Sequence, residues 1–162
     1  MRQFIVGILF IALLVGCSAK MDIIKAKLVS YEITHAPVIL ETYLQKAYQY
    51  YDEKKFDSTL VYCHKSYAEN SENWELFYLY GKTALQLHQF DQADFELSKA
   101  LALCKSQSDS RAQIYFALGE NEDARGNFAL AKQHYIMVIQ LTPNSELAES
   151  ASKKIHLISV VQ

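Results

Sequence analysis

The sequence predicts an all-α fold, built as a solenoid of antiparallel helical hairpins. Phe56 and Phe90 are 34 residues apart, a period at which helix–turn–helix units repeat in such solenoids. A glycine also precedes a phenylalanine by nine residues twice, as Gly81 before Phe90 and as Gly119 before Phe128. Gly and Pro are otherwise scarce, with five and two copies in 162 residues, which favours long uninterrupted helices. These positions set the register of the repeat.

The chain begins with a short apolar segment. Arg2 supplies a positive charge, and residues 4–16 then carry none. A membrane-spanning helix needs about 20 apolar residues, so this thirteen-residue run is too short and is typical of a secretory signal. It ends in the letters LVGC at Cys17, which resembles the lipobox of bacterial lipoproteins. The alternative is an ordinary signal peptide followed by a chance cysteine.

The lipobox resemblance implies a lipid anchor at Cys17. In lipoproteins the equivalent thiol receives a diacylglycerol group and becomes the new N-terminus. We therefore expect residues 1–16 to be removed and the covalent lipid to be the only cofactor. Two acyl chains anchor a protein stably without a spanning helix. Ser18 stands where Asp favours inner-membrane retention in enteric-type bacteria, so the expected location is the outer membrane, facing the periplasm.

Residues 17–37 connect the expected lipid to the repeat. Ile24, Leu28 and Tyr31 are spaced to form one apolar stripe of a short helix. One interpretation of this segment is a lipidated tether. The other is a pre-repeat helix that caps the first unit or lies in its groove.

The composition excludes some classes of partner. Removing residues 1–16 leaves 146 residues, enough for one domain, and takes Arg2 away, which changes the net charge from −2 to −3. A mildly acidic chain lacks the electrostatic footprint of a nucleic-acid binder. Cys63 and Cys104 remain in an oxidising compartment that permits disulfides. We expect them to be unpaired, with Cys63 acting as a small core residue.

The register gives three units, near residues 40–73, 74–107 and 112–145, in a domain of residues 38–158. The third unit is displaced by four extra residues, which we assign to a loop around residues 105–109. The expected helices cover residues 39–53, 57–69, 74–87, 91–104, 110–124 and 128–141.

Small residues are expected where the two helices of each unit cross. Ala47, Gly81 and Gly119 lie in the first helices, and Ala93 and Ala131 lie in the second helices.

Start and stop signals mark the helix ends. Ser110 and Gln113 have the spacing of a capping box, Asp91 and Asn127 are expected caps, and Gly126 is an expected stop.

A capping helix is expected at residues 145–158, after Pro143 and with Asn144 as its cap. Its predicted inner stripe is Leu147, Ala151, Ile155 and Ile158. Its predicted outward residues are Glu149, Lys153 and Lys154. A polar outer face is what the terminal element of a repeat array needs.

The three units resemble the tetratricopeptide repeat over about 105 residues. The third unit matches best, with Tyr115, Leu118, Gly119, Gly126, Phe128, Ala131, Tyr135 and Pro143. The second has Phe77, Tyr80, Gly81, Phe90, Ala93, Leu97 and Ala100. The first is weaker, with Tyr43, Ala47, Tyr50 and Phe56, then Thr59 and Cys63 where an alanine and an aromatic residue are usual.

The resemblance implies that the first helix of each unit lines a concave face that contacts ligand. The residues at those positions are Leu44, Tyr48, Tyr51, Tyr78, Lys82, Leu85, Phe116, Glu120 and Asp123. The set lacks the Lys/Asn clamp that some family members use for a terminal carboxylate, since only Lys82 could contribute. The set has aromatic and aliphatic side chains at one end and carboxylates at the other. We expect an aromatic groove for a helix or extended segment of a protein partner. The alternatives are coverage by residues 18–36 or self-association.

Nothing in the sequence predicts catalysis or a metal site. The five histidines are never three or four residues apart, and no HExxH, phosphate-binding glycine loop or GxSxG motif is present. We interpret the acidic cluster of Glu120, Glu122 and Asp123 as a solvated helix face.

The predicted function is therefore not enzymatic. It is a lipid-anchored scaffold or adaptor for protein–protein interaction at the bacterial cell envelope. The alternative is a chaperone-like or regulatory lipoprotein that binds a client protein or enzyme transiently.

Overall fold

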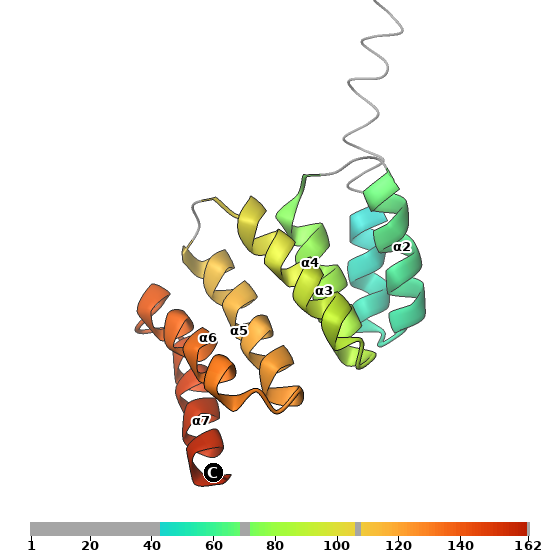
Figure 1. Cartoon of the computed structure of the whole chain (residues 1–162). Coiled ribbons are helices and arrows are strands. Elements are labelled where there is room, and N and C mark those ends of the chain that lie inside the picture. Colours follow the sequence, from blue (N-terminus) through green and yellow to red (C-terminus); the bar gives the residue numbers. More distant parts are fainter. Residues whose placement is uncertain (1–42, 69–71, 106–107, 162) are drawn as a thin grey trace, which may run out of the picture. The chain divides into compact units, whose positions relative to one another are not determined.

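A computed structural model of the chain describes residues 43–68, 72–105 and 108–161 (Figure 1). Residues 43–52 are helical. The helices that follow are α2 (Phe56–Ala68), α3 (Trp74–Gln86), α4 (Phe90–Leu103), α5 (Ser108–Ala124), α6 (Phe128–Leu141) and α7 (Glu146–Val161). The described ranges contain no strand, and the all-α prediction is confirmed. The expected signal peptide, the lipidated cysteine and the segment at residues 18–36 lie outside the described residues.

The helices pair as hairpins that stack side by side. α3 packs against α4 and α5 packs against α6, and the stack continues through contacts of α2 with α3, α4 with α5 and α6 with α7. α3 also contacts α5, and α5 contacts α7, whereas within the described ranges α2 does not contact α4 and α4 does not contact α6. The first helices of the hairpins therefore form one layer with α7, and the second helices form the other. This is the predicted solenoid of helical hairpins.

The same turn joins the two helices of all three hairpins. Lys54 and His88 have φ of 58° and Gly126 has φ of 80°, which is the left-handed conformation. In each turn the next residue donates its N–H to a carbonyl five residues earlier. These bonds run from Lys55 to Tyr50, from Gln89 to Ala84 and from Asn127 to Glu122, at 2.9, 2.9 and 2.8 Å. This is the Schellman helix ending, and Gly126 ends its helix as predicted.

The four extra residues of the third unit lengthen a helix, and Ser108 and Asp109 of the predicted loop are helical. α5 has 17 residues, whereas its counterpart α3 has 13. Ser110 therefore lies inside α5, and the predicted capping box with Gln113 is wrong. The added turn is held by Arg111, whose guanidinium donates to the carbonyl oxygens of Leu101 and Cys104 at 3.4 and 3.0 Å. Those carbonyls belong to the end of α4, where an arginine side chain can replace the missing helical donors.

The other predicted caps are only partly right. Asn127 does precede α6, but its side chain donates to Glu122 instead of accepting from the helix. Ser145, not Asn144, caps α7, because its Oγ accepts from the N–H of Ala148 at 3.1 Å. Asn73, which we did not predict, caps α3 by accepting from the N–H of Glu75 at 3.0 Å.

Close approach of the paired helices depends on the predicted small residues. A Cβ at Gly81 would lie 2.6 Å from Cγ of Leu97, and a Cβ at Gly119 would lie 2.6 Å from Cε1 of Tyr135. Ala47, Ala93 and Ala131 are fully buried. The predicted role of the two glycines is confirmed.

The two cysteines of the described chain are buried and unpaired, as predicted. Burial raises the pKa of the Cys63 thiol to about 12. A thiol in this environment stays protonated and is a poor nucleophile. Cys63 packs with Leu44, Ala47 and Leu76, which confirms its role as a small core residue.

Gly119→Ala should destabilise the fold by roughly 1–3 kcal/mol, the usual cost of overpacking a core. The added Cβ would meet the Tyr135 ring, and that ring is fully buried. Urea unfolding followed by circular dichroism measures the change. Gln133→Ala, at an exposed helical position, is the control and should change the midpoint little. An unchanged midpoint in Gly119→Ala would show that the crossing is loose.

Candidate protein-interaction surface

The structure brings most of the predicted contact residues to one surface of the layer of first helices. Tyr48 and Tyr51 precede α2, Tyr78, Lys82 and Leu85 lie on α3, and Phe116, Glu120 and Asp123 lie on α5. Each is partly exposed. We call these eight residues, together with Lys154 of α7, the strip. Leu44 does not belong to it, because Leu44 is 7% exposed and packs in the core with Ala47 and Cys63. It lies one helical turn before Ala47 and so faces α2.

The aromatic part of the strip is covered by a cation. The Lys82 Nζ lies 5.0 Å from the centroid of the Tyr51 ring and 5.5 Å from that of Tyr78. These distances suit cation–π interactions, and they join the first hairpin to the second. Burial raises the pKa of Tyr78 to about 12, with smaller contributions from Tyr51 and Glu120. The aromatic part of the surface therefore carries a positive charge over its rings, a contact that the sequence does not predict.

All four aromatic residues of the strip also pack against the core, Tyr48 and Tyr51 against one buried cluster and Tyr78 and Phe116 against two others. Tyr48 packs against the cluster that holds Cys63, and burial raises its pKa. The Phe116 ring lies 5.5 Å from the ring of buried Tyr135. Substitutions at Tyr48 and Phe116 therefore change folding stability as well as the surface.

Lys154 of α7 lies beside the acidic part of the strip, although the sequence predicts that it points outward. The Lys154 Nζ lies 3.9 Å from Oε1 of Glu120 and 3.7 Å from Oδ2 of Asp123. Lys154 was missed as a strip residue although its spacing gives the signal: it lies three residues after Ala151 and four before Ile158, both buried. Residues at this spacing share a helix face. Burial raises the pKa of Glu120, while Lys154 and Lys82 act against this increase.

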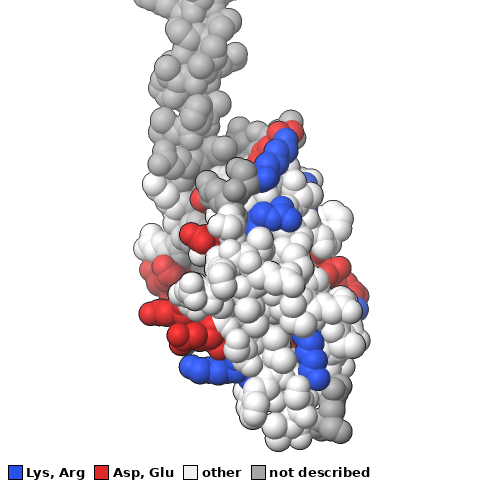
Figure 2. All heavy atoms as spheres, turned by 90° about the vertical axis from the view of Figure 1, so that its left-hand side faces the viewer, with Lys and Arg blue, Asp and Glu red and all other residues white. Residues whose placement is uncertain are grey.

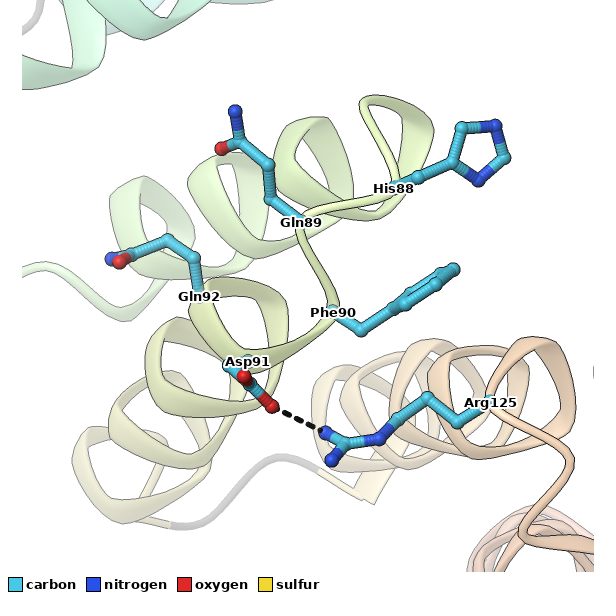
Figure 3. Close-up of a pocket in the computed structure, with 6 residues that line it drawn as sticks. All are labelled: His88, Gln89, Phe90, Asp91, Gln92 and Arg125. Atoms are coloured by element: carbon cyan, nitrogen blue, oxygen red, sulfur yellow. Dashed lines mark ion pairs between the residues drawn. The ribbon is translucent and has the colours of Figure 1, made fainter.

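Two neighbouring hollows share His88 and Phe90 in their linings. One, of about 410 Å³, is lined by Leu85, Gln86, His88, Phe90, Glu120, Asp123, Ala124 and Lys154, so it continues the strip. The other, of about 660 Å³, is lined by His88, Gln89, Phe90, Asp91, Gln92 and Arg125 (Figure 3).

The second hollow corrects the prediction for Asp91. Asp91 lies in the first turn of α4 and makes no capping bond, because Gln89 occupies the cap position. Its carboxylate pairs with the Arg125 guanidinium of α5 at 3.0 Å (Figure 3). The Asp91 side chain is 95% exposed, so this ion pair contributes little to stability.

The outer face of the capping helix is less polar than predicted. Leu157 and Val160 of α7 are 61% and 70% exposed, and Leu130 and Ile136 of α6 are also exposed. Figure 2 shows a broad uncharged area on the side of the molecule that presents these helices, with acidic side chains gathered along one edge. The inner stripe of α7 is as predicted, with Ala151 and Ile158 buried and Leu147 and Ile155 packed against the core.

Within the described ranges, no three His, Cys, Asp or Glu side chains are grouped to hold a metal ion. The same ranges contain no helix with the length and hydropathy needed to span a membrane.

Comparisons with known proteins identify the fold. No protein-family model matches the chain, and no curated protein matches it in sequence. The first TPR domain of human RPAP3 is similar in structure, with a TM-score of 0.67 and 22% identity over 77% of this chain and 95% of that one. The first TPR of Spaghetti (RPAP3), bound to the HSP90 peptide SRMEEVD, has a TM-score of 0.66 and 22% identity over 75% of this chain and 91% of that one.

A bacterial protein has the same architecture. The Yersinia enterocolitica type III secretion chaperone SycD, in complex with a peptide of the translocator YopD, has a TM-score of 0.67 and 17% identity over 75% of this chain and 93% of that one. Together these structures show that the chain has a tetratricopeptide-repeat-like fold, as its resemblance to that repeat predicts.

Glu120→Gln should make the fold more resistant to urea at neutral pH. Because burial raises the Glu120 pKa, the folded state binds this proton more tightly than the unfolded chain does. The charged form therefore costs stability above the folded-state pKa, and the cost disappears as the pH falls towards the unfolded value. The advantage of Glu120→Gln should vanish below its ordinary pKa of 4.5. Urea midpoints at both pH values measure this effect.

Glu149→Gln is the matched control, since Glu149 is an exposed carboxylate of α7. It should change the midpoint little at either pH. A Glu120→Gln protein that is less stable than wild type at neutral pH would mean that the pairing with Lys154 outweighs the burial of the carboxylate.

Proposed function

We propose that the mature protein is a protein-interaction module that binds a segment of a partner protein along the strip. The observation that carries this proposal is the continuity of the strip. Its residues come from the first helix of each of the three hairpins and from α7. Lys82 joins the first helix to α3, Lys154 joins α5 to α7, and the hollow lined by both Leu85 and Glu120 connects α3 to α5. The similar structures of RPAP3 and SycD with bound peptides support the same role for this fold.

We further propose that the module is held at the bacterial cell envelope by a lipid on Cys17. The short uncharged run and the LVGC sequence that ends it support this anchor, and Ser18 supports the outer membrane. The partner would then be a protein of the periplasm or of an envelope complex.

A second candidate function is transient binding of a client protein. The similarity to SycD, a secretion chaperone seen with a peptide of its translocator, favours it. A stable adaptor should co-purify with its partner from detergent extracts. A client binder should release its partner there and retain it only after crosslinking in intact cells.

Truncation of the strip should abolish partner capture. Tyr51→Ala with Leu85→Ala removes two partly exposed apolar side chains from the strip. The matched control, Val61→Ala with Phe95→Ala, removes two side chains that are 50% and 63% exposed on the helices of the other layer. Crosslinking in intact cells followed by pull-down and mass spectrometry should recover the same partner with wild type and control, and lose it with the strip variant.

Thermal unfolding of both variants by circular dichroism checks that each remains folded. Equal recovery of the partner by a folded strip variant would contradict the proposed function. Loss of the partner in the control alone would assign binding to the opposite layer.

Cys17→Ser tests the anchor. The serine oxygen cannot form the thioether, so metabolic labelling with an acyl chain should fall to background and the protein should leave the membrane fraction. Cys63→Ser in the same assay should label as wild type does, because Cys63 is buried in the core. Acyl labelling that persists in Cys17→Ser would rule out this anchor.

A further inference from the structure

We propose that the segment bound by the strip is basic. A lysine or arginine of the partner pairs with Glu120 and Asp123, and a neighbouring apolar side chain of the partner lies against the tyrosines of the strip. The inference deepens the proposed function and rests on it, because it names the chemistry of the partner at that same surface.

The charges around the strip favour a cationic partner. Glu120 interacts electrostatically with Tyr51, Tyr78 and Tyr135, and Asp123 with Tyr135. Asp52 interacts with Tyr51, and Glu75 interacts with Tyr48. Four carboxylates therefore interact with the tyrosines in and beneath the strip, whereas the strip itself has two ammonium groups, those of Lys82 and Lys154. A surface with an excess of one charge attracts segments of the opposite sign.

The two lysines leave the carboxylates incompletely satisfied. The Lys154 ammonium lies 3.9 and 3.7 Å from Glu120 and Asp123, which is longer than a hydrogen bond. The Lys82 ammonium instead rests over two tyrosine rings. Burial raises the pKa of Glu120 in spite of both lysines. A guanidinium or ammonium group of the partner can enter the hollow that Glu120 and Asp123 line. It can then donate directly to these oxygens in charge-assisted hydrogen bonds.

The rings beside the carboxylates fit the rest of such a segment. Tyr51 and Tyr78 are partly exposed, so their rings accept both aliphatic side chains and further cations. An acidic segment that paired with Lys82 or Lys154 would also face Glu120 and Asp123, which lie within 4 Å of Lys154. The HSP90 peptide SRMEEVD, seen with a protein of the same fold, has the opposite charge to the segment that we infer.

Peptide selection tests the inference. Full-length protein in detergent is immobilised and used to select from a display library of random short peptides. The affinity of the best peptide is then measured by fluorescence anisotropy with four proteins: wild type, Glu120→Gln with Asp123→Asn, Lys82→Met, and Glu146→Gln with Glu149→Gln. The last variant is the matched control, since it removes two exposed carboxylates of α7 outside the strip.

The selected peptides should be enriched in Lys and Arg beside apolar residues. Their affinity should fall about tenfold or more in Glu120→Gln with Asp123→Asn, as expected for lost hydrogen bonds to charged groups. It should change little in the control and should weaken as salt is added. Lys82→Met should bind these peptides at least as tightly as wild type.

Three outcomes would overturn the inference. Acidic peptides whose binding is lost in Lys82→Met would reverse the charge of the partner, yet the proposed function would stand. If light scattering shows that the protein is a dimer and that Tyr51→Ala with Leu85→Ala dissociates it, the strip binds a second copy of this chain. Selection that yields no peptide would contradict the proposed function itself, and the inference with it.

Discussion

The structure depends on the close crossing of the two helices within each hairpin. At Gly81 and Gly119 the first helix has no side chain, and the second helix fills that space with Leu97 or Tyr135, leaving no room for a Cβ. The crossing fixes which face of the first helix is buried. Successive residues of a helix are turned by about 100°, so Lys82 and Glu120, each one position after the glycine, point to the side of the crossing. The strip is the line of side chains that this constraint leaves partly exposed.

Repetition then extends one local geometry into a surface. The left-handed residue that ends each first helix recurs at Lys54, His88 and Gly126, so each hairpin closes in the same way and presents its first helix to the same layer. The spacing between the last two of these residues is four longer than between the first two, because the extra residues add a turn at the start of α5. They lie at the far end of that helix from Glu120 and Asp123, and the register of the strip is unchanged.

Much of this fold could be predicted from the sequence, because helix periodicity and the glycine positions are local signals. The errors have tertiary causes. Ser108 and Asp109 are typical of a loop, yet they are helical in α5, where Arg111 bonds to carbonyls of α4. Capping was misassigned where a nearby partner competes for the side chain. Asn127 bonds to Glu122, and Asp91 pairs with Arg125.

The candidate site shows the same division between local and tertiary information. The family pattern places eight of its nine predicted residues on one surface but also includes Leu44, whose burial depends on packing against α2. It cannot show that Lys82 rests on two tyrosine rings or that Lys154 closes the acidic end, because those contacts join different helices. The sequence predicts the separate aromatic and acidic ends of this surface, and the structure adds a lysine beside each of them.

Site-specific photocrosslinking in intact cells tests most directly whether this surface binds a partner protein. A photoreactive phenylalanine analogue is placed at Leu85, in the strip, and in a matched protein at Phe95, which is 63% exposed on α4. The strip position should crosslink to a distinct protein under ultraviolet light, and the α4 position should not. Crosslinking from position 95 with none from position 85 would contradict the account, because the partner would then bind the layer of second helices.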